Sequence, residues 1–248
     1  MTAAMLAAQT RAEALRIVRS PFFLIFSIGM PLAFYFLFAA LNGSDTVIES
    51  TVYGAYSLMS MTAFSLVGTA VSQFGIRLAY ERRDGWVRTL RLTPLSPSAW
   101  VGSKIAAHLV MHLAILLLLF ASGGLVYDLN LSIGVWISSG LWLWIGSVPF
   151  LALGALLGTM RHADAAIAVG NVLHLGMSVL GGLWMPLSVM PKWMQMVGQW
   201  LPTHRYAHGA WNLLAGSPPS AADWMILAGF GAVCMLLSVY ILNRREAI

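Results

Sequence analysis

Six long apolar runs constrain this chain more than any other feature of its sequence. None of the six contains Asp, Glu, Lys or Arg. A helix needs about 20 predominantly apolar residues to cross the roughly 30 Å hydrocarbon core of a bilayer. The runs lack the alternating polarity of a lipid-facing β-strand, which favours helices over a barrel. We therefore expect an all-α polytopic membrane protein with six transmembrane helices, at residues 22–41, 52–76, 105–127, 135–160, 165–185 and 224–242.

The composition excludes most soluble classes of protein. Hydrophobic residues make up 59% of the 248 residues and charged residues only 9%, whereas a soluble domain carries about 25% charged residues. The many large apolar side chains exclude a disordered chain, and the single cysteine, Cys234, excludes a disulfide scaffold. The length fits one transmembrane domain that covers residues 1–248.

The positions of the Lys and Arg residues predict the orientation. Twelve of the 14 lie before the first run, between the second and third, between the fourth and fifth, or after the last, and only Lys192 and Arg205 lie in the other connections. Because basic residues concentrate on the cytoplasmic side, both termini are expected there. The net charge of +5 then reflects topology and contact with anionic lipid rather than binding of nucleic acid.

The lack of charge within the runs bears on function. Charged residues inside a membrane usually mark ion pathways and proton relays, so the sequence argues against a proton-driven pump and weakens an ion-channel interpretation. A few neutral polar residues could line a substrate path, although polar contacts between helices explain them as well. A metal site is disfavoured, because the His pair in the third run has no Glu, Asp or Cys beside it. The candidate residues for a substrate path are Gln73, His108, His112, Asn171 and His174.

Glycine and proline mark two local features of the spans. Gly154 and Gly158 form a GxxxG pattern, which permits close approach of another helix. Pro31 and Pro149 are expected to kink the first and fourth spans, because proline removes a backbone hydrogen bond and clashes with the preceding turn.

The loop at residues 77–104 is expected on the cytoplasmic side. Charged and aliphatic residues alternate irregularly there, and Asp84-Gly85 predicts a break between two short helical pieces. A solvated, topology-determining loop would explain the arginines. It would not explain the exposed Trp86, so docking of a partner protein is an equal alternative.

The longest connection on the other side covers residues 186–219. An amphipathic helix is predicted within residues 190–201, with Trp193, Met196, Val197 and Trp200 on one face. A second helical piece follows Pro202. This segment could dip into the outer leaflet or lie on its surface. The pair His204 and His208 could hold a metal, but an exposed interfacial helix face is favoured.

Enzyme signatures are missing from the sequence. It contains no GxxxxGK[ST] phosphate-binding loop and no GxSxG nucleophile elbow. Any energy from ATP must therefore come from another subunit.

Several stretches of this sequence, taken in chain order, resemble the permease subunits of ABC-2 type transporters. The resemblance rests on Arg19-Ser20-Pro21 followed by Pro31, on ERRDGWVRTLRLTPLS at residues 81–96, on the Pro-rich segment that begins at Met185-Pro186, and on the six spans. It covers essentially the whole chain. Trp86 is a departure, because relatives often carry a smaller residue there.

The resemblance implies a division of labour between subunits. A separate ATP-binding-cassette ATPase would bind ATP and Mg²⁺, this chain would bind no cofactor or metal, and two permeases, identical or different, would pair in a bacterial cytoplasmic membrane. Residues 1–20 would form an interfacial helix, and an external cap would include Pro186, Trp193, Trp200 and Pro202. The loop would dock in the ATPase through Glu81, Arg82, Arg83, Asp84, Gly85, Trp86, Arg88, Thr89, Leu90, Thr93 and Pro94.

The expected cargo follows from the apolar interior, which suits a hydrophobic or amphiphilic drug, antibiotic, peptide or lipid-like molecule. We therefore expect an exporter. Export of a lipid-linked polysaccharide, or a membrane scaffold that transports nothing, are the alternatives.

Overall fold

The computed structural model describes residues 3–21, 25–48, 51–85 and 97–246. Within these residues, six helical stretches are long and apolar enough to cross a membrane, which confirms the prediction of six spans. They are Ile25–Asn42, Tyr53–Arg83, Ala99–Val126, Ile133–Leu157, Ala163–Leu180 and Ala221–Arg244.

Several spans are composed of more than one helical element. In chain order the elements of the spans are η1 (Ile25–Gly29), α3 (Met30–Asn42), α4 (Tyr53–Gly68), η2 (Thr69–Gly75), α5 (Ile76–Arg83), α7 (Pro97–Val126), α8 (Ile133–Gly146), α9 (Val148–Leu157), α10 (Ala163–Leu180) and α13 (Ala221–Glu246). Here η1 and η2 are π-helical turns. The remaining elements are α1 (Ala3–Val18), β1 (Val47–Ile48), β2 (Thr51–Val52), η3 (Leu187–Val189), α11 (Lys192–Gly198) and α12 (Pro202–Leu214).

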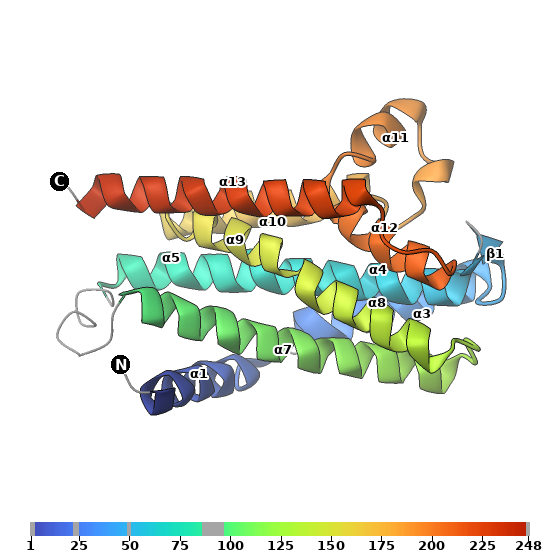
Figure 1. Cartoon of the computed structure of the whole chain (residues 1–248), viewed down its shortest axis with the longest axis horizontal. Coiled ribbons are helices and arrows are strands. Elements are labelled where there is room, and N and C mark those ends of the chain that lie inside the picture. The colour runs from blue at the N-terminus through green and yellow to red at the C-terminus, as the bar shows by residue number, and fades with distance from the viewer. Residues whose placement is uncertain (1–2, 22–24, 49–50, 86–96, 247–248) are drawn as a thin grey trace.

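The spans run along the long axis of the molecule (Figure 1). Helix α1, the end of α5, the start of α7 and the end of α13 lie at one end, which we call the basic end. The strands, α11 and α12 lie at the opposite end, which we call the α12 end. Both ends of the chain therefore share one side, as an even number of spans requires. That the basic end faces the cytoplasm stays a prediction.

The second span forms the centre of the bundle. Its apolar window is 94% buried, against 17% for the last span. Elements α4 and η2 contact α3, α7, α9, α10 and α12. A helix that is enclosed on all sides has no lipid-facing stripe, and the small residues of YGAYSLMSMTAFSLVG in α4 permit neighbours on every face.

The GxxxG pattern marks a close contact between two helices. Gly75 of η2 packs on the backbone of Gly154 in α9, and a Cβ atom at Gly154 would overlap the carbonyl oxygen of Ala70. Gly158 packs under the side chain of Leu78. The glycines thus bring the second and fourth spans into backbone contact, as small residues do in membrane helices.

Helix ends differ from the predicted ends of the apolar runs. The second span continues to Arg83, past the predicted limit at residue 76, and α7 begins at Pro97, before residue 105. The helical backbone does not stop where hydrophobicity stops, so Arg77, Glu81 and Lys104 lie within helices although they lie outside the apolar runs. The fifth span ends at Leu180, before residue 185, because Gly182 adopts a left-handed φ of 83°.

Three further observations concern the connections and the fourth span. An antiparallel pair of short strands, β1 and β2, joins the first two spans, which the all-α expectation missed. The fourth span is interrupted at Ser147, just before Pro149. The predicted amphipathic helix within 190–201 is present as α11, and its apolar face is exposed at Trp193 and Met196.

We expect Gly154→Ala to lower the thermal unfolding midpoint in detergent, because the added methyl group overlaps the Ala70 carbonyl. Overpacking of this kind costs about 1–3 kcal/mol. Gly229→Ala is the matched control, since a Cβ atom there meets nothing within 4 Å. Alanine at that position is expected to be neutral or stabilising, by up to about 1 kcal/mol. Equal midpoints for the two variants, measured by tryptophan fluorescence, would contradict the packing argument.

Candidate functional site: a polar cavity and a buried ion cluster

A cavity of about 890 Å³, which we call the polar cavity, lies beside the second span. It extends from charged residues near the end of α5 to Phe64 in α4, so one side of the second span forms a wall from Phe64 to Glu81. Elements α1, η1, α3, α7 and α10 supply the other walls. The lining residues are Arg16, Ile17, Ser20, Phe26, Ser27, Met30, Phe64, Ser65, Gly68, Thr69, Ser72, Gln73, Ile76, Arg77, Tyr80, Glu81, Asp84, His108, Asn171, His174 and Leu175.

Two π-helical turns, η1 and η2, face the cavity. Pro31 has no N–H to donate to the carbonyl of Ser27, and the Ser65 hydroxyl donates to this carbonyl instead. The Ser27 hydroxyl in turn accepts a hydrogen bond from Gln73 Nε2 at 2.7 Å. Turns of this kind are rare and occur frequently at functional sites. Here they bring polar groups of the first two spans together at the cavity wall.

His174 closes part of the wall from α10. Its ring stacks on Phe64 with a centroid distance of 4.5 Å, and its Nε2 donates to the Phe64 carbonyl at 3.1 Å. The absence of a side chain at Gly68 makes room for the ring, because a Cβ atom there would overlap it. Nearby, the buried hydroxyl of Ser72 has no hydrogen-bond partner among the described residues.

Four of the five candidate path residues line the polar cavity: Gln73, His108, Asn171 and His174. His112 lies outside the lining. It is fully buried, and its ring is hydrogen-bonded to Thr69 at 2.9 Å and to Ser147 at 2.8 Å. Its polar contacts therefore join the second, third and fourth spans, and its role as a path residue stays a prediction.

A buried ion cluster lies at the basic end of the cavity. Lys104 Nζ is 2.8 Å from Glu13 Oε1 and 2.8 Å from Glu81 Oε2. Arg77 bridges the same two carboxylates at 3.5 and 3.3 Å, and Arg16 approaches Glu81 at 3.4 Å. The cluster thus joins α1, α5 and α7, which are far apart in the sequence.

Burial makes this cluster energetically important. The side chains of Lys104, Glu13 and Glu81 are only 3, 6 and 9% exposed. A buried charge is tolerated only when it is paired and hydrogen-bonded, and removal of one partner leaves the other uncompensated. The position of α1 on the bundle therefore depends on this cluster.

The residues assigned to ATPase coupling lie in different surroundings. The carboxylate of Glu81 points into the ion cluster, whereas Arg83 pairs with Asp84 at 3.1 Å on the surface. Gly85 ends α5 with a left-handed φ of 74°, as glycine commonly does after a helix; Arg82 belongs to the last turn of α5. Trp86, Arg88, Thr89, Leu90, Thr93 and Pro94 lie outside the described residues.

A second buried charge lies at the α12 end. Asp223 accepts hydrogen bonds from His208 Nδ1 at 3.0 Å and from the backbone N–H of Ser220 at 2.8 Å, and Arg205 lies 3.5 Å away. The Ser220 hydroxyl caps the start of α13 in return, by accepting from the Asp223 N–H. This cluster fastens α12 to α13. His204 donates instead to the Gly181 carbonyl at 3.0 Å.

Among the described residues, no group of three or more His, Cys, Asp or Glu side chains could hold a metal ion. The histidine pairs considered from the sequence contact protein groups instead. His108 donates to the Lys104 carbonyl, and His208 pairs with Asp223.

Helix α12 is part of the bundle rather than a loose appendage. It packs against α4, α8, α10 and α13. Tyr206 and Trp211 of α12 are buried, and the Trp142 indole donates to the Tyr206 carbonyl at 2.7 Å. Helix α11 projects from the bundle at the α12 end, where it contacts α10 (Figure 1). Trp193 within α11 and Trp200 just after it are both exposed.

Comparison with known proteins identifies the family. The family described as "ABC-2 family transporter protein" matches residues 44–240. The chain is also 39% identical, over 240 residues, to the "Putative transport permease YvfS" of Bacillus subtilis (strain 168). That alignment covers 97% of this chain and 98% of the relative.

The chain belongs to the ABC-2 transporter family. The resemblance inferred from the sequence is therefore confirmed. This ABC-2 permease is a multi-pass membrane protein and the membrane subunit of a transporter, and its family implies an ABC transporter with an ATPase partner.

Sequence analysis missed several residues of the permease that the structure brings together. Lys104 entered only the count of basic residues, and Glu13 and Asp223 were not singled out. Ser27 and Ser72 were not singled out at all. A usable signal existed for Glu13, because it is the single acidic residue before the first span.

We expect Lys104→Met to destabilise the permease by about 3 kcal/mol, because it leaves two buried carboxylates short of a cation. Adding Glu81→Gln should recover part of this loss. Arg83→Met is the matched control, since its pair with Asp84 is half exposed and contributes less than about 1 kcal/mol. Thermal unfolding in detergent measures all three. If Lys104→Met and Arg83→Met lost the same stability, the cluster would not hold α1 in place.

Proposed function

We propose that the permease forms half of the translocation path of an ABC exporter for hydrophobic or amphiphilic compounds. The observation that carries this proposal is the gradation of the polar cavity. Charged groups, among them Arg77 and Asp84, line it near the end of α5, neutral polar groups such as Gln73 line its middle, and Phe64 and Met30 line its apolar part. A molecule with a polar head and an apolar body matches this gradation.

We place the basic end in the cytoplasm of a bacterium, because basic residues concentrate on the cytoplasmic side of membrane proteins. Cargo would enter the polar cavity there and leave at the α12 end. Helix α12 would be a re-entrant element, and Trp193 of α11 and the nearby Trp200 would lie at the membrane interface, where such side chains are enriched. The external cap would then consist of α11 and α12.

A second permease would complete the path. Phe26 is 56% exposed and Val172 is 70% exposed, on the first and fifth spans beside the polar cavity. The exposed Asn171 adjoins them. A second subunit, identical or different, would cover these groups and enclose the cavity. The resemblance to transporters that use paired permeases supports this arrangement.

The separate ATPase would act through the end of α5. Helices α4, η2 and α5 form one continuous span from Tyr53 to Arg83, so a movement imposed beyond Gly85 reaches the cavity wall directly. Glu81 ties this span to α1 and α7 and would make the three move together. ATP binding would then favour an outward-facing state, and hydrolysis would restore the inward-facing one.

Alternating access can be tested with a thiol probe. We expect Ser72→Cys, in a Cys234→Ala background, to react with a membrane-impermeant maleimide in inside-out vesicles that contain the permease and its co-purifying ATPase. ATP with vanadate should slow this reaction several-fold by closing the polar cavity. Ser217→Cys, at the α12 end, is the control for orientation and should react only in right-side-out vesicles.

Two outcomes of this labelling experiment would contradict the proposal. Labelling of Ser72→Cys that does not respond to nucleotide would favour a scaffold that transports nothing. Labelling of Ser217→Cys in inside-out vesicles would show that the orientation is reversed.

The direction of transport can be tested with the dye ethidium, a small amphiphilic cation. Export predicts ATP-dependent accumulation of ethidium inside inside-out vesicles. We expect Gln73→Leu to reduce the initial rate several-fold, because it removes the donor to Ser27 at the cavity wall, whereas Gly229→Leu on the outer face of α13 should not. ATP-dependent loss of preloaded dye would indicate import, and no movement would argue against this class of cargo.

A further inference from the structure

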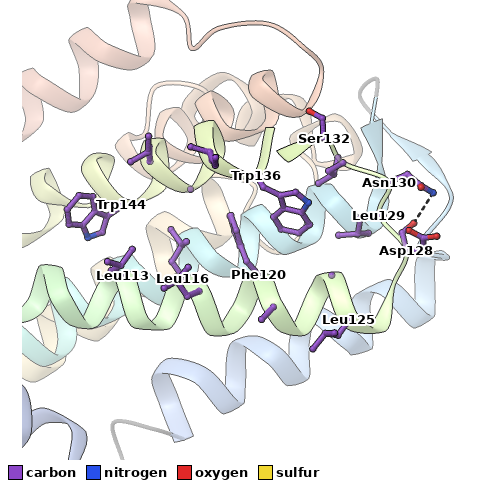
Figure 2. A pocket seen from close by; sticks show the side chains of 17 residues that line it. Leu113, Leu116, Phe120, Leu125, Asp128, Leu129, Asn130, Ser132, Trp136 and Trp144 are labelled. Atoms are coloured by element: carbon purple, nitrogen blue, oxygen red, sulfur yellow. Dashed lines mark hydrogen bonds between the residues drawn. The ribbon is translucent and has the colours of Figure 1, made fainter. Parts of the chain in front are cut away.

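A second hollow of about 1100 Å³ lies between α7 and α8 (Figure 2). We call it the α7–α8 groove. It shares no residue with the polar cavity. Both helices belong to spans, and Leu117, Ile137 and Leu141 at the groove are each at least half exposed. The groove therefore opens toward the lipid.

The shape of the groove is specified by its residues. Phe120 and Trp136 meet edge to face at its centre, with centroids 5.0 Å apart. Gly124 and Gly140 leave space on either side of this pair. A Cβ atom at Gly124 would approach only Trp136, at 3.6 Å, so the space there is open. The two small residues that flank the aromatic pair thus contribute to an open hollow along the two helices.

The length of the groove corresponds to one leaflet of a bilayer. Its α7 wall runs from Leu113 to Leu125, which is about 18 Å at the usual helical rise of 1.5 Å per residue. Half of a 30 Å hydrocarbon core is about 15 Å. The groove ends at the connection of residues 128–132, at the α12 end, where the headgroups of that leaflet would begin.

The polar end of the groove carries an unpaired negative charge. Asp128 is exposed, and its carboxylate has no hydrogen bond or ion pair with any described residue. Asn130 has a left-handed φ of 47° and donates from Nδ2 to the Asp128 carbonyl, which fixes the turn (Figure 2). The lining includes no Lys or Arg. This charge is complementary to a cation.

We propose that the α7–α8 groove is a binding site for a phospholipid with an ammonium headgroup, such as phosphatidylethanolamine. One acyl chain fills the groove along Phe120, and the ammonium group lies at Asp128. The lipid comes from the leaflet at the α12 end, which is the outer leaflet in the proposed orientation. The proposal requires only that α7 and α8 span the membrane, so it does not depend on the cargo or on the direction of transport.

Native mass spectrometry of the purified permease tests the proposal. The permease in detergent is titrated with phosphatidylethanolamine or phosphatidylglycerol of identical acyl chains. We expect the ethanolamine lipid to be retained more strongly, by about 2–5-fold, the range of an exposed ion pair. Asp128→Asn should abolish this preference, and Asp128→Lys should reverse it. Asp45→Lys is the matched control, because Asp45 is also exposed at the α12 end but lies outside the groove.

A second pair of variants tests the chain-binding part. Gly124→Leu fills the groove and should reduce retention of both lipids, whereas Gly229→Leu, on the lipid-facing side of α13, should not. The Asp128 variants keep the test decisive if Gly124→Leu fails to fold. Equal retention of both lipids by all variants would show ordinary, non-specific lipid contact and overturn the proposal. Conversion of a dimer to a monomer by Gly124→Leu, with lipid retention unchanged, would assign the groove to a second copy of the chain instead.

Discussion

The enclosure of the second span by the other helices determines where polar groups can lie in this permease. A polar group in hydrocarbon must find its partner within the protein. Because α4 and η2 contact most of the other spans, their side chains meet partners on several sides. Ser65 reaches the first span, Thr69 meets His112 of the third, and His174 of the fifth reaches the Phe64 carbonyl. The polar cavity is thus a consequence of one helix having no lipid-facing side.

The buried ion cluster ties three helices together, and this affects how they can move. Lys104, Glu13 and Glu81 come from three helices, and separating any two of them would expose an unpaired charge to a poorly solvated region. Movements of α1, α5 and α7 that break the cluster are therefore costly, while movements of the three helices together are not. This favours transmission of force from the end of α5 as a rigid-body displacement. The π-helical turn η2 directly precedes α5 in the chain and lines the cavity, so such a displacement would reach the cavity wall there.

The sequence predicted the features that depend on hydrophobicity alone and missed those that depend on pairing. The six spans follow from apolar length, and Gly85 as a helix end follows from local chemistry. The cluster of Glu13 with Lys104 could not be predicted, because it depends on how α1 packs against α7, and nothing local encodes that packing. The π-helical turns were missed for the same reason: Pro31 signals a lost hydrogen bond, but not that Ser65 of another span replaces it. Nothing in the sequence indicated that Lys104, Glu13 and Glu81, which lie near the ends of helices, would be buried together.

Two hollows of comparable size differ in chemistry because they differ in neighbours. The polar cavity adjoins the central span, whose Ser, Thr and Gln side chains line it, and charged residues of α1 and α5 surround its basic end. The α7–α8 groove lies between two peripheral spans and is lined by Leu, Phe and Trp, with charge only at Asp128. An amphiphilic cargo would match a cavity that offers both polar and apolar groups, whereas a resident lipid needs a polar group only at its headgroup. The distribution of polar residues is therefore the feature on which the proposed route for cargo and the proposed site for lipid differ.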